Sequence, residues 1–128
     1  FETPVDQVAR TPDTRHSLAL EPLARYGDST AFLCYETATA GPLLSAALGA
    51  GLEVPRDLSI VTFGRLLRND TGISISTMFV PMEKMGEQAA RMVLRMVREN
   101  AGRCGPMPVP PTWMPGRTCG PPPIKGYR

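Results

Sequence analysis

The chain has 128 residues, the length of one domain, and 42% of them are hydrophobic, which suffices for a core and argues against wholesale disorder. It also has 12 glycines and 14 prolines, and 8 of those prolines follow residue 100, so the regular part is shorter than the length indicates. No apolar run reaches the roughly 18 residues of a membrane span. The start, Phe1-Glu2-Thr3-Pro4, lacks an initiator Met and a signal sequence and is typical of an internal segment of a longer protein.

Charge and cysteine usage narrow the function classes. Fourteen basic and twelve acidic residues give a net charge of +2, too small to favour nucleic-acid binding. The three cysteines, Cys34, Cys104 and Cys119, are odd in number and widely spaced, which argues against a disulfide framework and a zinc site. This pattern suits a reducing compartment, so we expect a cytoplasmic protein without metal or cofactor. Cys34 lies in an apolar run and is expected in the core.

The first third of the chain predicts one weak helix and one strand. Residues 1–16 show no periodicity and are expected to be irregular. Residues 17–26 carry a weak helical stripe that Pro22 interrupts, unless the helix begins near Glu21. Residues 30–35 form a short apolar run between turn signals, which predicts a strand covered on both faces.

The next segment completes a βαβ unit. A helix is expected to begin between Thr37 and Gly41 and to end near Gly51, with Pro42 in its first turn, where a missing N–H is tolerated. Residues 58–63 form a second β-branched apolar run and predict a strand. Strand, helix and strand in this order indicate two parallel strands joined by a crossover, and hence an α/β fold.

A third strand and the longest helix follow. Apolar and polar side chains alternate in residues 73–79, which predicts a strand with one face more exposed than the other. Residues 81–100 predict a helix with a methionine-rich apolar stripe that we expect to be core, and ion pairs are expected for Glu87 with Arg91 and for Arg95 with Glu99. The arginines on its other face predict either a solvated surface, which is favoured, or a phosphate contact. Within the proline-rich remainder, residues 109–114 could form only an edge strand.

The motifs of common enzymes are missing from the sequence. It contains no nucleophile elbow, zinc-protease motif, P-loop or dinucleotide fingerprint. The one histidine, His16, has no specific partner and is expected to be an exposed loop residue. We therefore expect no enzyme. Open parallel sheets bind ligands at the carboxyl ends of their strands, which here are residues 35–37 and 63–65.

Two stretches of sequence resemble the lactose/galactose-repressor family of bacterial transcription regulators. The first begins with Thr-Ala-Phe-Leu-Cys at residues 30–34 and ends with Gly-Leu-Glu-Val-Pro-Arg-Asp-Leu-Ser-Ile-Val-Thr-Phe at residues 51–63. It aligns with the family without gaps from residue 30 to residue 64. The second comprises Ile-Ser-Thr-Met at residues 75–78 and Met-Gly-Glu-Gln-Ala-Ala at residues 85–90, and residues 109–118 are similar to the family's closing segment. The resemblance covers about 90 residues and implies a periplasmic-binding-protein-like (type I) fold, incomplete in this chain.

The resemblance implies effector-contacting positions at Glu36, Thr37, Gly64, Arg65 and Met82. The sequence departs from the family there. Glu36 and Thr37 replace an Asn-Asp pair, and Gly64, followed by Arg65, replaces an Asp that commonly grips a ligand hydroxyl. Met82 occupies an apolar or aromatic position that faces the cleft. These changes put an unaltered mode of sugar binding in doubt.

The implied organisation is the C-terminal portion of an effector-binding domain over residues 17–116, preceded by the irregular residues 1–16 and followed by a Pro/Gly-rich tail at 117–128. The implied function is effector sensing and dimerisation in a regulator that binds operator DNA only through a segment absent from these residues. The expected partners are a small, sugar-like effector and a second copy of the chain, with no membrane. Two alternatives remain, a fragment of an extracytoplasmic sugar-binding transport protein and a ligand-free structural remnant.

Overall fold

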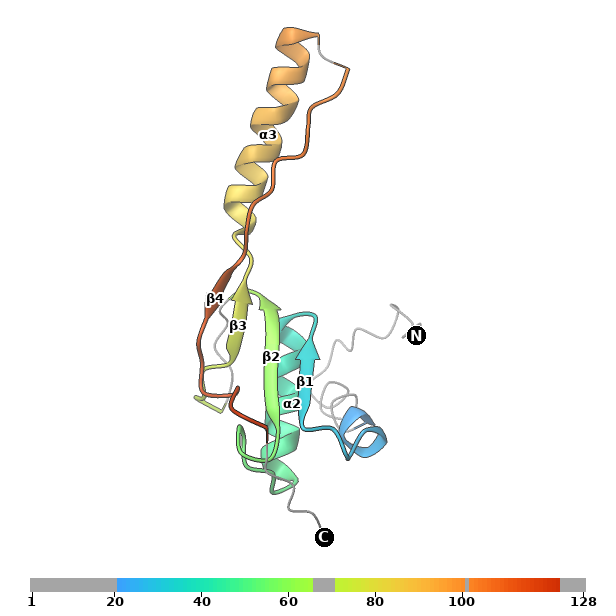
Figure 1. Cartoon of the computed structure of the whole chain (residues 1–128), viewed down its shortest axis with the longest axis vertical. Helices are drawn as coiled ribbons and strands as arrows, with labels where there is room; N and C mark the ends of the chain where they lie inside the picture. Colours follow the sequence, from blue (N-terminus) through green and yellow to red (C-terminus); the bar gives the residue numbers. More distant parts are fainter. Residues whose placement is uncertain (1–20, 66–70, 101, 123–128) are drawn as a thin grey trace.

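A four-stranded sheet forms the body of the protein (Figure 1). The computed structural model describes residues 21–65, 71–100 and 102–122. The strands are β1 (Ala31–Cys34), β2 (Ser59–Gly64), β3 (Ser76–Phe79) and β4 (Thr112–Met114), in the spatial order β1-β2-β3-β4. The first three are parallel, and β4 is an antiparallel edge strand beside β3. The expected α/β fold with parallel βαβ connectivity is therefore present.

Helix α2 (Thr37–Gly49) connects β1 to β2 and covers one face of the sheet (Figure 1). It begins only two residues after β1, so Pro42 lies in the second turn of the helix and not in the first as expected. Because proline has no N–H, the carbonyl of Ala38 loses its helical partner. Ala38 is exposed, and this allows water to take the place of that partner.

The core lies between α2 and the sheet. It consists of Cys34, Ala40, Leu43, Leu44, Ala47, Leu58, Ile60 and Ile75. Burial of Cys34 agrees with its position in an apolar run and raises the pKa of its thiol to about 11, because the thiolate would be desolvated. Each fully buried leucine contributes roughly 1.5–3 kcal/mol of hydrophobic stabilisation, so this single interface is the main source of stability in the body.

The opposite face of the sheet is apolar and open. The strand register places Leu33 beside Val61, and Phe63, Met78 and Trp113 in one row across β2, β3 and β4. Leu33 is 67% exposed, Phe63 37% and Trp113 44%. The expectation that residues 30–35 would be covered on both faces is therefore wrong, because α2 covers one face and, among the residues that the structure describes, none covers Leu33 on the other.

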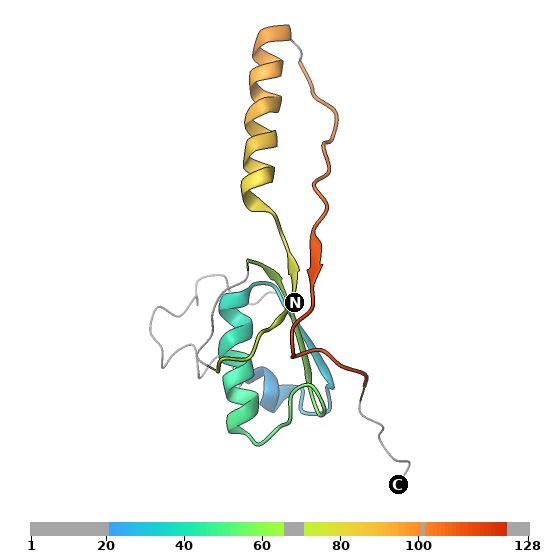
Figure 2. The same cartoon turned by 90° about the vertical axis from the view of Figure 1, so that its left-hand side faces the viewer.

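Helix α3 (Met82–Glu99) extends away from the sheet, and residues 102–111 return alongside it (Figures 1 and 2). We call α3 and residues 102–111 the arm. No residue of α3 is buried, and Met82, Met85, Val93 and Val97 are between 42% and 75% exposed. The expectation that the methionine-rich stripe is core is therefore wrong for this chain, because among the described residues only the thin stretch of chain at 102–111 runs beside α3 and does not bury it. The helix ends at Asn100, which adopts a left-handed conformation with φ 47°.

Residues 116–120, here called the closing segment, insert between the starts of β2 and β3. The hydroxyl of Thr118 donates to the carbonyl of Ile60 at 2.6 Å and accepts from the N–H of Ser76 at 2.9 Å. The N–H of Ile60 donates to the carbonyl of Thr118 at 2.7 Å. A Cβ on Gly116 would lie 2.5 Å from the backbone of residues 74–76, so only glycine fits there. The closing segment thus ties β2 and β3 together.

For most helices and strands, the predicted first and last residues lie within one to three residues of the observed ones. Residues 21–25 are helical, whereas residues 17–20 of the weak predicted helix lie outside the described residues. The irregular segment 1–16 and His16 also lie outside them. The division into 1–16, 17–116 and 117–128 remains a prediction.

Candidate functional site

The carboxyl end of β1 leads directly into α2 and places two of the predicted site residues there. Glu36 precedes the helix in an extended conformation, with φ −146° and ψ 159°, and its exposed side chain makes no capping hydrogen bond. Thr37, the first residue of α2, is only 7% exposed. The two neighbours therefore differ in what they offer, since Glu36 presents a carboxylate to solvent and Thr37 faces inward.

The carboxyl end of β2 lies next to this junction. The Thr37 hydroxyl donates to the carbonyl of Arg65 at 2.7 Å. Gly64, the last residue of β2, has φ +115°, a conformation that residues with a Cβ rarely adopt. Only glycine turns the chain this way without strain, so the carboxylate that the resembling family carries at this position could not be restored on this backbone without cost.

The carboxyl end of β3 is the third part of the cluster. The N–H of Val80 donates to the Gly64 carbonyl at 3.1 Å, and the N–H of Met82 donates to the Val80 carbonyl at 2.8 Å. Met82 is the first residue of α3 and is 58% exposed. The structure thus brings Glu36, Thr37, Gly64, Arg65 and Met82 together at one edge of the parallel sheet, here called the strand-end site.

The charged groups of the strand-end site are accessible. Glu36 and Arg65 are both exposed, and neither belongs to any of the ion pairs found among the described residues. A carboxylate accepts hydrogen bonds from hydroxyls, and a guanidinium donates five N–H groups in a planar fork. Met82 adds an adaptable apolar surface. These side chains could hold a small polar molecule with one apolar face.

Sequence reasoning missed the backbone links of this site. The contact from Val80 to Gly64 uses only main-chain atoms, so no side-chain pattern signals it. Tyr35, which the sequence already placed at the strand end with Glu36 and Thr37, is 87% exposed.

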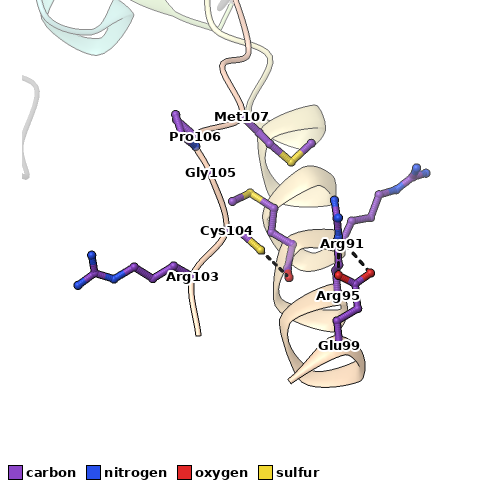
Figure 3. Close-up of a pocket in the computed structure, with 9 residues that line it drawn as sticks. Arg91, Arg95, Glu99, Arg103, Cys104, Gly105, Pro106 and Met107 are labelled. Carbon is purple, nitrogen blue, oxygen red and sulfur yellow. Dashed lines mark hydrogen bonds and ion pairs between the residues drawn. The ribbon is translucent and has the colours of Figure 1, made fainter. Parts of the chain in front are cut away.

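A hollow of about 430 Å³ lies on the arm between α3 and residues 103–107 (Figure 3). Two of its arginines are already paired, Arg91 with Glu87 at 2.6 Å and Arg95 with Glu99 at 3.0 Å. In Figure 3 the Arg103 side chain points away from the helix. Both predicted ion pairs are confirmed, and Arg91 and Arg95 are exposed, as in a solvated helix face.

Metal ligands, cysteine pairing and membrane spans are three further features of residues 21–65, 71–100 and 102–122. Within these ranges no three His, Cys, Asp or Glu side chains gather as metal ligands would. Cys34, Cys104 and Cys119 are free thiols. None of the helices described there has both the length and the apolar character that crossing a membrane requires.

Comparison with known proteins decides the family. Residues 3–119 match the periplasmic binding protein-like domain. The chain belongs to this family. The mostly parallel sheet of the periplasmic binding protein-like chain agrees with that assignment.

Named relatives of the periplasmic binding protein-like chain are transcription regulators. It is 37% identical over 73 residues to the arabinose metabolism transcriptional repressor of Geobacillus stearothermophilus, a match that covers 56% of this chain and 20% of the repressor. Its fold is similar to that of a LacI-family regulator of Bifidobacterium animalis subsp. lactis, with TM-score 0.74, 21% identity, and coverage of 88% of this chain and 42% of the regulator. A LacI-family regulator of Arthrobacter sp. FB24 in complex with lactose has TM-score 0.69, 15% identity, and coverage of 85% and 41%.

These matches confirm the resemblance to part of an effector-binding domain of the lactose/galactose-repressor family. The chain spans less than half the length of each of these three relatives.

Proposed function

We propose that this chain is the ligand-sensing part of a cytoplasmic LacI-type transcription regulator and binds a small, sugar-like molecule at the strand-end site. The observation that carries the proposal is the convergence of Glu36, Arg65 and Met82 at the carboxyl ends of three parallel strands. Ligands of open α/β sheets bind at this edge. One similar structure is a complex with lactose, and one similar repressor concerns arabinose metabolism, which favours sugars as the ligand class.

The proposed role is binding, without catalysis. Glu36 would accept hydrogen bonds from ligand hydroxyls, Arg65 would donate to ligand oxygens, and Met82 would pack against the apolar face of a sugar ring. The ligand would favour one arrangement of the domain over another, and this difference in affinity would alter DNA binding through a segment outside these 128 residues.

The test is a ligand titration of the isotopically labelled chain with lactose and L-arabinose, followed by backbone NMR. We expect the amide signals of Glu36, Arg65 and Met82 to shift, whereas those of residues 94–99 at the far end of the arm stay in place. A saturating sugar, at about 100 times its Kd, should stabilise the chain by about 2.7 kcal/mol. Sugar-induced shifts confined to the arm would contradict the proposed site.

A pair of arginine variants sharpens this test. Arg65→Ala should lower the affinity for the sugar by about tenfold, because a charged hydrogen bond contributes roughly 1.5–3 kcal/mol. Arg103→Ala removes an equally exposed arginine on the arm and serves as the matched control. Equal losses in the two variants would indicate a nonspecific charge effect and would contradict a role for Arg65.

We further propose that the chain forms a homodimer through its exposed apolar surfaces. Leu33, Phe63 and Trp113 on the open sheet face, together with Val93 and Val97 on α3, leave apolar area in contact with water. Light scattering should therefore give a mass above that of one chain at micromolar concentration. A concentration-independent monomer mass would contradict this proposal.

A further inference from the structure

A buried hydroxyl lies beneath the strand-end site. Thr37 is 7% exposed, and its Oγ1 donates to the Arg65 carbonyl at 2.7 Å across 28 positions of sequence. Threonine hydroxyls near a helix start commonly bond to the backbone of their own turn. Here the hydroxyl bonds instead to the residue that follows β2, so it links the start of α2 to the end of β2 just beyond the last paired residues of β1 and β2, Cys34 and Thr62.

Gly64 makes this link sterically possible. Its φ of +115° turns the chain immediately before Arg65, and a Cβ built on Gly64 would lie 3.9 Å from Thr37 Oγ1. The turn and the hydroxyl are therefore in direct proximity. A glycine is free to adopt many other conformations, and the hydrogen bond from Thr37 to the next residue favours this one.

The link continues to the third strand end. Val80 donates to the Gly64 carbonyl at 3.1 Å, and Met82 donates to the Val80 carbonyl at 2.8 Å. A continuous series of contacts thus runs from the start of α2, through the end of β2, to the start of α3. Thr37 supplies its one side-chain member, and the remaining contacts are between main-chain groups.

We infer that Thr37 is a positioning residue of the strand-end site. By holding the Arg65 carbonyl it fixes how the side chains of Glu36 and Arg65 are presented relative to each other, and thereby sets the affinity for the ligand. The inference rests on the proposed function, in which Glu36 and Arg65 contact the ligand. It also changes the role expected for Thr37, whose buried and already bonded hydroxyl acts through its neighbours and does not touch the ligand.

Three variants test the role of Thr37. Thr37→Val keeps the shape of the side chain and removes the donor, whereas Thr37→Ser keeps the donor. Thr39→Val makes the same exchange at an exposed threonine two residues further along α2 and serves as the control. Each protein is measured for amide hydrogen exchange at Val80, for affinity toward lactose and L-arabinose, and for melting temperature.

In Thr37→Val we expect exchange at Val80 to be roughly five- to tenfold faster, which corresponds to the loss of one hydrogen bond. Sugar affinity should fall by a similar factor. Thr37→Ser and Thr39→Val should stay within about twofold of the parent in both measurements, the variation expected when the hydrogen bond is kept.

Each other outcome is decisive. Unchanged Val80 exchange in Thr37→Val, or Thr37→Ser behaving like Thr37→Val, overturns the inference. A lower melting temperature with unchanged sugar affinity also overturns it, because Thr37 would then only stabilise the fold. If the parent binds neither sugar while Val80 exchange responds and serine restores it, the link between strand ends stands and the proposed sugar ligand fails.

Discussion

The body of the protein and its arm each contain a helix with apolar residues, but the surroundings of the two helices differ. Helix α2 buries Leu43, Leu44 and Ala47 against the sheet, although its apolar residues occupy most of its circumference. Helix α3 separates an apolar stripe from a charged face far more clearly, yet it buries no residue. Clear amphipathicity therefore shows which face of a helix is suited to burial, while the partner surface decides whether burial occurs.

The largest expected contrast between body and arm comes from one truncation made in each helix. Leu44→Ala in α2 should cost about 2–5 kcal/mol, because Leu44 is fully buried and its removal leaves a cavity. Leu94→Ala in α3 makes the same exchange at a side chain that is 55% exposed and should cost less than about 1 kcal/mol. Urea denaturation measures both. Similar losses would show that Leu94 is buried in solution, so that the proposed dimer would cover more of α3 than the face with Val93 and Val97.

The next contrast concerns two glycines, one in the closing segment and one in the arm. Gly116→Ala places a Cβ 2.5 Å from the backbone of residues 74–76, where no flexible side chain can yield, and should cost about 3 kcal/mol. At Gly105, in the arm, an added Cβ meets nothing within 4 Å, so Gly105→Ala should be close to neutral. Thermal unfolding compares them. A neutral Gly116→Ala would show that the closing segment does not insert between β2 and β3.

The body was largely predictable from the sequence because its elements are short apolar runs and stripes that local periodicity identifies. The strand-end site was also predictable in outline, since the carboxyl ends of parallel strands meet at one edge. The hydrogen bonds of Thr118 to Ile60 and Ser76 were not predictable, because a loop residue gives no periodic signal. The exposure of α3 was not predictable either, since it depends on surfaces that lie elsewhere in space.

The next contrast is between Gly64, in the strand-end site, and Gly49, at the end of α2. Gly64→Ala should destabilise by about 1–2 kcal/mol, because alanine is strained at φ +115°. Gly49→Ala, at the end of α2, meets nothing within 4 Å and should stabilise by roughly 0.5 kcal/mol through helix propensity. The opposite signs are checked by the same urea titration. Stabilisation by Gly64→Ala would mean that β2 ends in an ordinary conformation.

The smallest expected effect distinguishes the thiols of the two regions. Burial raises the pKa of Cys34 to about 11, above the 9.0 of an unperturbed thiol, so the folded state holds a proton that the unfolded chain releases above pH 9. Stability should therefore be constant below pH 8 and fall by about 0.7 kcal/mol between pH 8.5 and 9.5.

Cys34→Ala should remove this part of the pH dependence, whereas Cys104→Ala, in the arm, should leave it. The same burial should make Cys34 the slower of the two thiols to react with iodoacetamide at pH 8, because the thiolate is the nucleophile and Cys104 is only partly buried. Equal alkylation rates for Cys34 and Cys104 would indicate that the core between α2 and the sheet opens as readily as the arm.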